Sequence, residues 1–210
     1  MIARDIRPDS YVNLGIGQPT LVADHLPVGC GVVLHTENGM LHMGPGATGG
    51  PTDPLDPDLT NAGKQPVTEL PGASYFHQAD SFAMMRGGHL DVCVLGAFQV
   101  SAGGDLANWH TGEPGAVPGV GGAMDLATGA RRLVVMMSLF TGDGAAKLVP
   151  TCTCPLTGVG CVDRIYTDLA SFDVGPGGVR LLTTHGITPS ELATRLDVEL
   201  IVGDVAPAAP

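Results

Sequence analysis

The chain has 210 residues, of which 31 are glycine and 17 are proline, well above the average usage of about 7% and 5%. Apolar residues make up 44% of the chain and charged residues 15%, so it can bury a core, which excludes a disordered tail or a coiled coil. Because 10 Lys and Arg stand against 21 Asp and Glu, the net charge is −11 at pH 7, which argues against a general nucleic-acid-binding protein.

Short apolar segments alternate with glycine-rich turns, as in parallel strands joined by helical crossovers. The expected strands are residues 11–14, 31–35, 90–95, 132–136, 162–167 and 179–182. The expected helices are residues 18–25, 81–86, 122–127 and 188–195. Aromatic residues are only 4% of the chain, so Val, Leu, Ala and Met must fill the interior. The pattern predicts an α/β fold, with an open, mostly parallel sheet and helices on both faces.

A single domain is expected over residues 1–204, followed by a flexible C-terminal tail at 205–210 with the sequence VAPAAP. Residues 43–71 are rich in Pro and Gly, so we expect a long irregular loop there, and such loops tend to be functional. The last expected helix begins TPSE, in the pattern of a capping box.

The cysteine count is odd, and no signal peptide is recognisable, which favours free thiols and the cytoplasm over a disulfide framework. Cys152 and Cys154 form a CxC pair with Cys161 nearby, but no histidine lies near them in sequence and zinc-ribbon spacing is CxxC. Small buried thiols are therefore favoured over a metal site. No apolar run approaches the roughly 20 residues of a membrane-spanning helix, so neither a membrane nor nucleic acid is expected as a partner.

The strongest local pattern is LHTENGMLHMGP, in which an apolar strand ends directly in Glu37, Asn38 and Gly39. In open α/β sheets, ligands bind beyond the carboxyl ends of the strands, so Glu37 is placed for chemistry. Asn38 and Gly39 tolerate left-handed backbone conformations, which allows a sharp turn that leaves the carboxylate facing a pocket. From the spacing alone, a solvated turn glutamate is the alternative, and the more frequent case.

Two glycine-rich segments can reach the same edge of the sheet. In YVNLGIGQPT, a strand is followed by Gly15 and Gly17, although the third glycine of the dinucleotide-binding pattern is missing. In VPGVGGAMDL, Gly121 and Gly122 precede a helix and can present N–H donors to an oxyanion or a carboxylate. A plain tight connection is the alternative for each segment.

These segments, together with LTNAGKQPVTELPGAS, DSFAMMRGGHLDVCVLGAFQV, GDLANW and CPLTGVGCVDRIYTDLA, resemble the β subunits of the family I CoA-transferases. The resemblance runs in the same order from Ile2 to about Ile201 and is narrowest to the β subunits of enzymes that act on 3-oxoacids or 3-oxoadipate. It implies the fold shared by NagB, RpiA and the CoA-transferases.

The resemblance implies a ping-pong reaction that moves CoA from succinyl-CoA to a 3-oxoacid, without a metal or redox cofactor. In this family, the glutamate of the ENG motif attacks the acyl-CoA and becomes a glutamyl-CoA thioester, and Glu37 matches that glutamate. The segment GQPTLVADHL resembles the enzymes that act on 3-oxoadipate, which favours this acid over acetoacetate.

The resemblance also implies roles for other residues. Asn13 matches an asparagine that lines the carboxylate pocket, with an asparagine that caps its own turn as the alternative. Gly121 and Gly122 match the glycine loop that approaches the acyl group, so their N–H groups are oxyanion candidates. The expected substrate-binding residues are Asn13, Gly15, Gly17, Asn38, Gly39, Gly121 and Gly122, with Glu37 as the catalytic residue.

The resemblance is to a β subunit alone, and the chain contains no GGF segment of the kind with which the α subunit helps to bind CoA. It therefore implies an obligate heteromer with an α subunit, of α2β2 composition, with the active site at the junction. The net charge of −11 is consistent with CoA phosphates that are met mostly by the partner.

Two other functions stay open. An isomerase-like enzyme would use Glu37 as a general base, with pH-dependent proton exchange and no covalent CoA adduct. A non-catalytic subunit would only stabilise an α chain, and its complex would keep full activity after Glu37→Gln.

Overall fold

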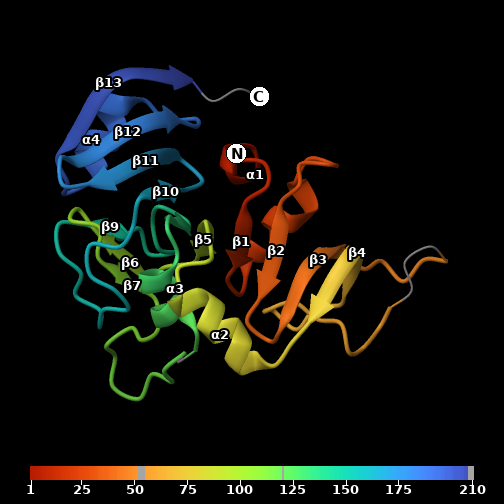
Figure 1. The fold of residues 1–210 in the computed structure, drawn as a ribbon. Coiled ribbons are helices and arrows are strands. Elements are labelled where there is room, and N and C mark those ends of the chain that lie inside the picture. The colour runs from red at the N-terminus through yellow and green to blue at the C-terminus, as the bar shows by residue number, and fades with distance from the viewer. Residues whose placement is uncertain (52–54, 120, 208–210) are drawn as a thin grey trace. The chain divides into compact units, whose positions relative to one another are not determined.

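The computed structural model describes residues 1–51, 55–119 and 121–207 (Figure 1). The chain divides into two compact units. The first unit comprises Met1–Leu95 and Thr128–Arg132, and the second comprises Gly96–Ala127 and Leu133–Pro210. Each unit is described by itself below.

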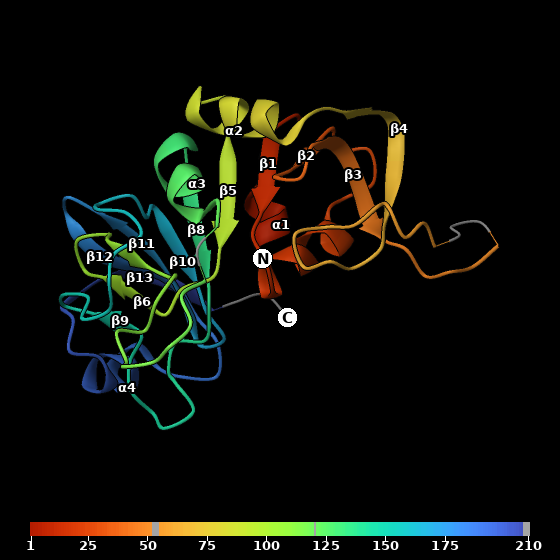
Figure 2. The same cartoon turned by 90° about the horizontal axis from the view of Figure 1, so that it is seen from below.

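The first unit is built on a sheet with the strand order β5-β1-β2-β3-β4. Its strands are β1 (Tyr11–Leu14), β2 (Val33–Thr36), β3 (Met40–Gly46), β4 (Val67–Tyr75) and β5 (Val92–Leu95). Its helices are α1 (Ile2–Asp5), the 3₁₀ helix η1 (Gln18–His25) and α2 (Gln78–Arg86). β1 pairs in parallel with β2 and with β5, whereas β2, β3 and β4 pair antiparallel. In Figure 2, α2 lies over the part of this sheet formed by β1, β2 and β5.

The second unit holds a sheet with the order β13-β12-β11-β10-β8 and a small sheet with the order β7-β6-β9. Its strands are β6 (Gln99–Ser101), β7 (Leu106–Ala107), β8 (Leu133–Met136), β9 (Leu148–Val149), β10 (Arg164–Tyr166), β11 (Ala170–Gly175), β12 (Gly178–Thr184) and β13 (Leu200–Pro207). The helix α3 (Ala123–Gly129) begins in this unit, and α4 (Pro189–Arg195) belongs to it. β8 and β10 are parallel, as are β12 and β13, while β11 is antiparallel to both of its neighbours.

The expected α/β fold with an open, parallel-rich sheet is confirmed, and antiparallel strands extend it. β1 and η1 have the predicted bounds, although η1 is a 3₁₀ helix. The irregular loop predicted over residues 43–71 is wrong at both ends, because β3 and β4 occupy them. β4 is mostly exposed and lies at the end of the strand order, where the backbone tolerates Pro71 and Gly72.

The predicted starts of two helices, α4 and α2, can be compared with their N-cap residues in the structure. At α4 the predicted capping box is confirmed, because Thr188 Oγ1 accepts from the Glu191 N–H at 3.2 Å and Glu191 Oε2 accepts from the Thr188 N–H at 2.9 Å. At α2 the predicted start at residue 81 is too late. His77 is the N-cap, with its Nδ1 accepting from the Ala79 N–H at 3.1 Å.

At the C-terminus, β13 runs to Pro207 and pairs in parallel with β12. The tail expected at residues 205–210 therefore begins within a strand, and residues 208–210 lie outside the described residues.

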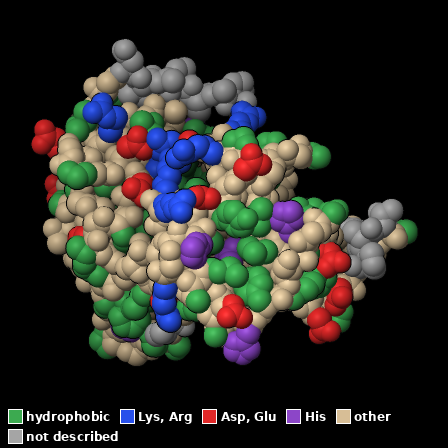
Figure 3. All heavy atoms as spheres, in the orientation of Figure 1, with side chains coloured by type: hydrophobic (Ala, Val, Ile, Leu, Met, Phe, Trp, Pro, Cys, Tyr) green, Lys and Arg blue, Asp and Glu red, His purple; other side chains and the backbone are tan. Residues whose placement is uncertain are grey.

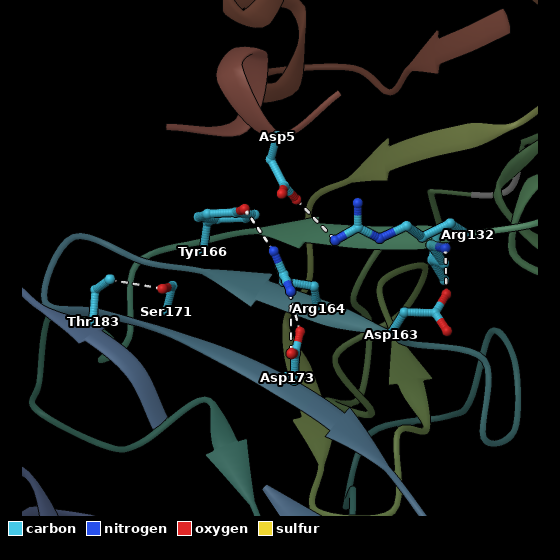
Figure 4. Close-up of polar contacts among 9 residues, drawn as sticks. Asp5, Arg132, Asp163, Arg164, Tyr166, Ser171, Asp173 and Thr183 are labelled. Carbon is cyan, nitrogen blue, oxygen red and sulfur yellow. Dashed lines mark hydrogen bonds and ion pairs between the residues drawn. The ribbon is translucent and has the colours of Figure 1, made fainter. Parts of the chain in front are cut away.

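Polar contacts also join neighbouring strands of the second unit. Figure 4 shows Arg164 on β10 paired with Asp173 on β11, with Nε and Oδ1 at 2.6 Å, and a hydroxyl pair, Ser171 with Thr183, at 2.7 Å. In the first unit, Arg132 pairs with Asp5 at 2.8 Å. On the face shown in Figure 3, Lys and Arg side chains lie among Asp and Glu side chains.

Candidate active site

Glu37 begins the turn that joins β2 to β3. β2 ends at Thr36 and β3 begins at Met40, so three residues reverse the chain at the carboxyl end of a strand that is parallel to β1. Thr36 holds both ends of the turn, since its Oγ1 accepts from the Met40 N–H at 3.0 Å and its carbonyl accepts from the Gly39 N–H at 3.2 Å. Glu37 itself is half-buried. The predicted placement of this carboxylate at a strand end is confirmed.

The other two turn residues fasten the turn to neighbouring segments. Asn38 is exposed, and its Nδ2 donates to the Thr60 carbonyl at 3.2 Å. Gly39 has a φ of +109°, and its carbonyl accepts from the Phe76 N–H at 3.0 Å. A Cβ at Gly39 would collide with the Phe76 carbonyl oxygen. This position therefore needs glycine both for its backbone conformation and for its close approach to Phe76.

A row of buried polar side chains crosses the three parallel strands behind this turn. In the strand register, Asn13 on β1 stands opposite His35 on β2 on one side and Cys93 on β5 on the other. All three are at most 2% exposed. The Asn13 Nδ2 donates to the His35 carbonyl at 3.2 Å and lies 3.1 Å from His35 Nδ1, while the Cys93 Sγ lies 4.0 Å from Asn13 Oδ1.

Ser81 on α2 continues this row. Its Oγ lies 2.9 Å from His35 Nε2 and donates to the Thr36 carbonyl at 2.9 Å. The His35 ring also stacks on Phe76, with ring centroids 6.3 Å apart. The row therefore ends on the peptide unit that leads into Glu37.

Burial and a nearby charge shift the pKa values of two side chains in this row, His35 and Cys93. Burial lowers the pKa of His35 to about 4, and the hydrogen bond with Ser81 acts in the opposite direction. Burial also raises the pKa of Cys93 well above its ordinary value, and the negative charge of Glu37 raises it further. At neutral pH both side chains are uncharged, and the Glu37 carboxylate lies close enough to the row to influence it.

The glycines after β1 have different surroundings. A Cβ at Gly15 would lie 2.8 Å from Leu95 Cδ2 and 3.1 Å from the Val94 carbonyl oxygen, so the chain passes close to the end of β5 there. Gly17 is exposed, has a φ of +86° and has nothing near its Cβ position. Its carbonyl accepts from the Thr20 hydroxyl at 2.8 Å, which fixes the start of η1. Contact of either glycine, or of Asn13, with a substrate stays a prediction.

Gly121 and Gly122 belong to the second unit. Gly121 is exposed, whereas Gly122 is buried and its carbonyl accepts from the Leu126 N–H at 2.9 Å at the start of α3. Residue 120, within the predicted glycine loop, lies outside the described residues. The convergence of these glycines with Glu37 stays a prediction.

The thiols of the CxC segment make weak polar contacts with backbone carbonyl groups. The Cys154 Sγ lies 3.3 Å from the Thr111 carbonyl oxygen, and the Cys152 Sγ lies 3.8 Å from that of Asp105. All five cysteines are free thiols. Within residues 1–51, 55–119 and 121–207, no three His, Cys, Asp or Glu side chains gather as a metal site would require. In the same part of the chain, no helix has the length and apolar character needed to cross a bilayer.

Sequence reasoning missed His35, Ser81 and Cys93 as neighbours of the site. One signal was present, because His35 and Asn13 are polar residues inside otherwise apolar strands that are expected to be buried. Their pairing depends on the strand register, which no local pattern in the sequence gives.

The sequence of this chain is similar to known proteins over most of its length. The family model described as Coenzyme A transferase matches residues 1–193. The chain is 61% identical over 181 residues to the B subunit of the 3-oxoadipate CoA-transferase of Pseudomonas putida, and the match covers 86% of this chain and 83% of that protein. It is 47% identical over 201 residues to the B subunit of the probable succinyl-CoA:3-ketoacid coenzyme A transferase of Bacillus subtilis, where the match covers 95% and 91%.

A solved structure shares the fold. The acyl-CoA transferase YdiF of Escherichia coli O157:H7, as the apoenzyme, matches with a TM-score of 0.73 at 20% identity, covering 100% of this chain and 42% of that one. The strand-end glutamate turn, the extent of the family match and the identity to curated relatives agree with one another. The chain therefore belongs to the Coenzyme A transferase family.

Proposed function

We propose that this chain is the β subunit of an enzyme that moves CoA from succinyl-CoA to a 3-oxoacid, with Glu37 as the covalent nucleophile. The observation that carries the proposal is the Glu37 turn, which holds a half-buried carboxylate at the carboxyl end of a strand in a chain of this family. The relatives named above support it, since their names give 3-oxoadipate and 3-ketoacid CoA-transferases.

The reaction follows from carboxylate chemistry. The ordinary pKa of a glutamate side chain is about 4.3, so a glutamate nucleophile is ionised at neutral pH and needs no general base. The Glu37 carboxylate attacks the thioester carbonyl of the acyl-CoA, which gives a mixed anhydride and releases the CoA thiolate. The thiolate then attacks the glutamyl carbonyl, the first acid leaves as its carboxylate, and a glutamyl-CoA thioester remains. A second carboxylate takes over the CoA by the reverse of these steps, and no oxidant or reductant is consumed.

In water, a carboxylate is stabilised by hydrogen bonds from its hydration shell, and the pocket must replace these with fixed hydrogen-bond donors. Fixed backbone dipoles stabilise the tetrahedral intermediates, and the loss of one well-placed donor typically costs about 3 kcal/mol of transition-state stabilisation. The backbone N–H groups of Gly121 and Gly122 are our candidates for these donors, with Asn13, Gly15, Gly17, Asn38 and Gly39 shaping the substrate pocket. Binding energy from the distant part of CoA offsets the cost of stripping water from the carboxylate.

We assign 3-oxoadipate as the preferred acceptor, with acetoacetate as the other candidate. The 61% identity to a relative named for 3-oxoadipate supports this assignment. The relative at 47% identity carries the broader name 3-ketoacid, which keeps acetoacetate in the comparison. Turnover of both acids by the same preparation decides between them.

The proposal includes an α subunit as partner, in an α2β2 complex. Both relatives are named as one subunit of a larger enzyme, and this chain covers only 42% of YdiF. The net charge of −11 also leaves most of the CoA phosphates to be met elsewhere, on the partner. Five free thiols fit a reducing compartment, so we place the complex in the cytoplasm.

The test is to assemble the chain with its α subunit, add succinyl-CoA, and trap the thioester with borohydride or hydroxylamine before peptide mass analysis. We expect the modification on Glu37. An active complex without this adduct would overturn the covalent mechanism, and solvent proton exchange in its place would favour the isomerase-like alternative. Full transfer activity in a Glu37→Gln complex would instead identify the chain as a non-catalytic subunit.

A further inference from the structure

The buried polar row behind Glu37 ends on the peptide unit that leads into this residue. We propose that His35 and Ser81 are positioning residues for Glu37, and that a directed hydrogen-bond relay from Asn13 through His35 and Ser81 to the Thr36 carbonyl fixes the backbone from which the nucleophile projects. This inference rests on the nucleophilic role proposed for Glu37.

The directions of the hydrogen bonds follow from the partners. The Asn13 side chain faces the His35 carbonyl, which only accepts, so the amide nitrogen of Asn13 is on that side. The same nitrogen lies 3.1 Å from His35 Nδ1, so Nδ1 accepts and the proton of the neutral ring is on Nε2. Nε2–H then donates to Ser81 Oγ at 2.9 Å, and the Ser81 hydroxyl donates to the Thr36 carbonyl at 2.9 Å.

The relay acts on Glu37 through one rigid unit. The Thr36 carbonyl accepts from Ser81 at 2.9 Å and from the Gly39 N–H at 3.2 Å. This carbonyl and the N–H of Glu37 belong to the same planar peptide group. Two hydrogen bonds on one oxygen therefore fix the plane that sets the direction in which the Glu37 side chain leaves the chain.

Burial separates this role from direct catalysis. Ser81 and Cys93 are 0% exposed and His35 is 2% exposed, so none of these three side chains presents a surface to a substrate. Among the described residues, every buried side-chain nitrogen or oxygen has a hydrogen-bond partner. A fully satisfied buried network is rigid, and removal of one member leaves its neighbours unpaired.

The relay differs from a purely stabilising network in its effect on rate. Displacement of a reacting group by about 1 Å can cost roughly a hundredfold in rate. A loosened Thr36 peptide plane should therefore lower kcat and leave the KM for succinyl-CoA nearly unchanged, because the buried side chains of His35 and Ser81 are shielded from the substrate. Loss of stability alone would lower the amount of folded enzyme, but not the kcat per folded active site.

The experiment uses the full chain assembled with its α subunit, with active sites counted by the Glu37 adduct. Ser81→Ala should lower kcat and the single-turnover rate of adduct formation together, by about 10-fold to 100-fold. His35→Gln keeps a terminal amide donor toward Ser81 and should retain most of the activity that His35→Leu loses. If His35→Leu does not fold, Ser81→Ala and His35→Gln still test the relay.

The matched control is Ser171→Ala. Ser171 is 2% exposed, and this substitution removes a hydroxyl that forms a part-buried hydrogen bond with Thr183 in the second unit. We expect it to lower the melting temperature without changing kcat. The relay is wrong if Ser81→Ala keeps the wild-type kcat, or if Ser171→Ala lowers kcat by the same factor.

A second measurement separates this inference from the proposed function. If the wild-type complex forms no Glu37 adduct, the proposed function fails, whatever the variants do. The tautomer of His35 can be measured by nitrogen NMR of the complex with ¹⁵N-labelled histidine. We expect the proton on Nε2, and we expect the Nε2 chemical shift to change in Ser81→Ala. A proton on Nδ1 would overturn the relay.

Discussion

Gly39 lies so close to the Phe76 carbonyl oxygen that no side chain fits between them, while its own carbonyl accepts from the Phe76 N–H at 3.0 Å. The turn that carries Glu37 is thereby fastened to the segment that follows β4. Because φ at Gly39 is +109°, steric and conformational demands coincide at one residue.

Gly39→Ala should therefore destabilise the protein by about 3 kcal/mol, since both a backbone collision and an unfavourable φ must be relieved. Urea denaturation of the assembled complex measures the change in the free energy of unfolding. Gly17→Ala is the control, because φ there is +86° but nothing lies near its Cβ position, so only the conformational cost of about 1 to 2 kcal/mol applies. Equal losses in the two variants would contradict the close approach to Phe76.

Glu37→Gln should abolish CoA transfer, with kcat lower on the order of 10⁴-fold or more, because an amide cannot form the covalent intermediate. The substitution preserves the size of a half-buried side chain, so assembly and melting temperature should stay near those of the wild type. Steady-state transfer rates and thermal melting measure both quantities. Glu113→Gln, at an exposed position of the second unit, removes a carboxylate without removing activity.

The stability of the protein should fall as the pH is lowered from about 6.5 to about 4. Burial lowers the pKa of His35 from 6.5 to about 4, so within this window the unfolded chain binds a proton that the folded chain does not. The pKa shift corresponds to about 3 kcal/mol of the free energy of unfolding. This stabilisation is fully present above pH 6.5 and is lost as the pH approaches 4.

Urea denaturation at several pH values measures this dependence. His35→Gln, which does not titrate, should flatten the curve. Parallel curves for wild type and His35→Gln would show that His35 titrates normally in the folded protein.

Thr188→Ala should lower stability by about 1 kcal/mol, because it removes the hydroxyl that accepts from the Glu191 N–H at the start of α4. Ser190→Ala, one position into the same helix and exposed, should change stability by less than about 0.5 kcal/mol. Thermal or urea unfolding compares the two. A loss at Ser190 as large as that at Thr188 would mean that the capping box does not hold this helix end.

Much of the fold could be predicted from local patterns. The bounds of β1, the capping box of α4 and the strand-end position of Glu37 each depend on residues close together in the chain. The start of α2 could not be predicted in this way, because an imidazole, that of His77, takes the capping role. β4 was missed because its exposed position at the end of the strand order relaxes the demand for an apolar pattern.

The amino-acid sequence alone establishes the family pattern and the ENG turn, because the residues that form a tight turn are adjacent in the chain. The steric demand for glycine at Gly39 comes from Phe76, far along the chain, and only the folded structure shows it. The folded chain was needed to show that Asn13, His35 and Cys93 form one row and that Ser81 completes it. These residues are far apart in the chain and meet through the strand register and the packing of α2. Long-range register depends on the whole sheet, so no short segment of sequence encodes which polar side chains support the nucleophile.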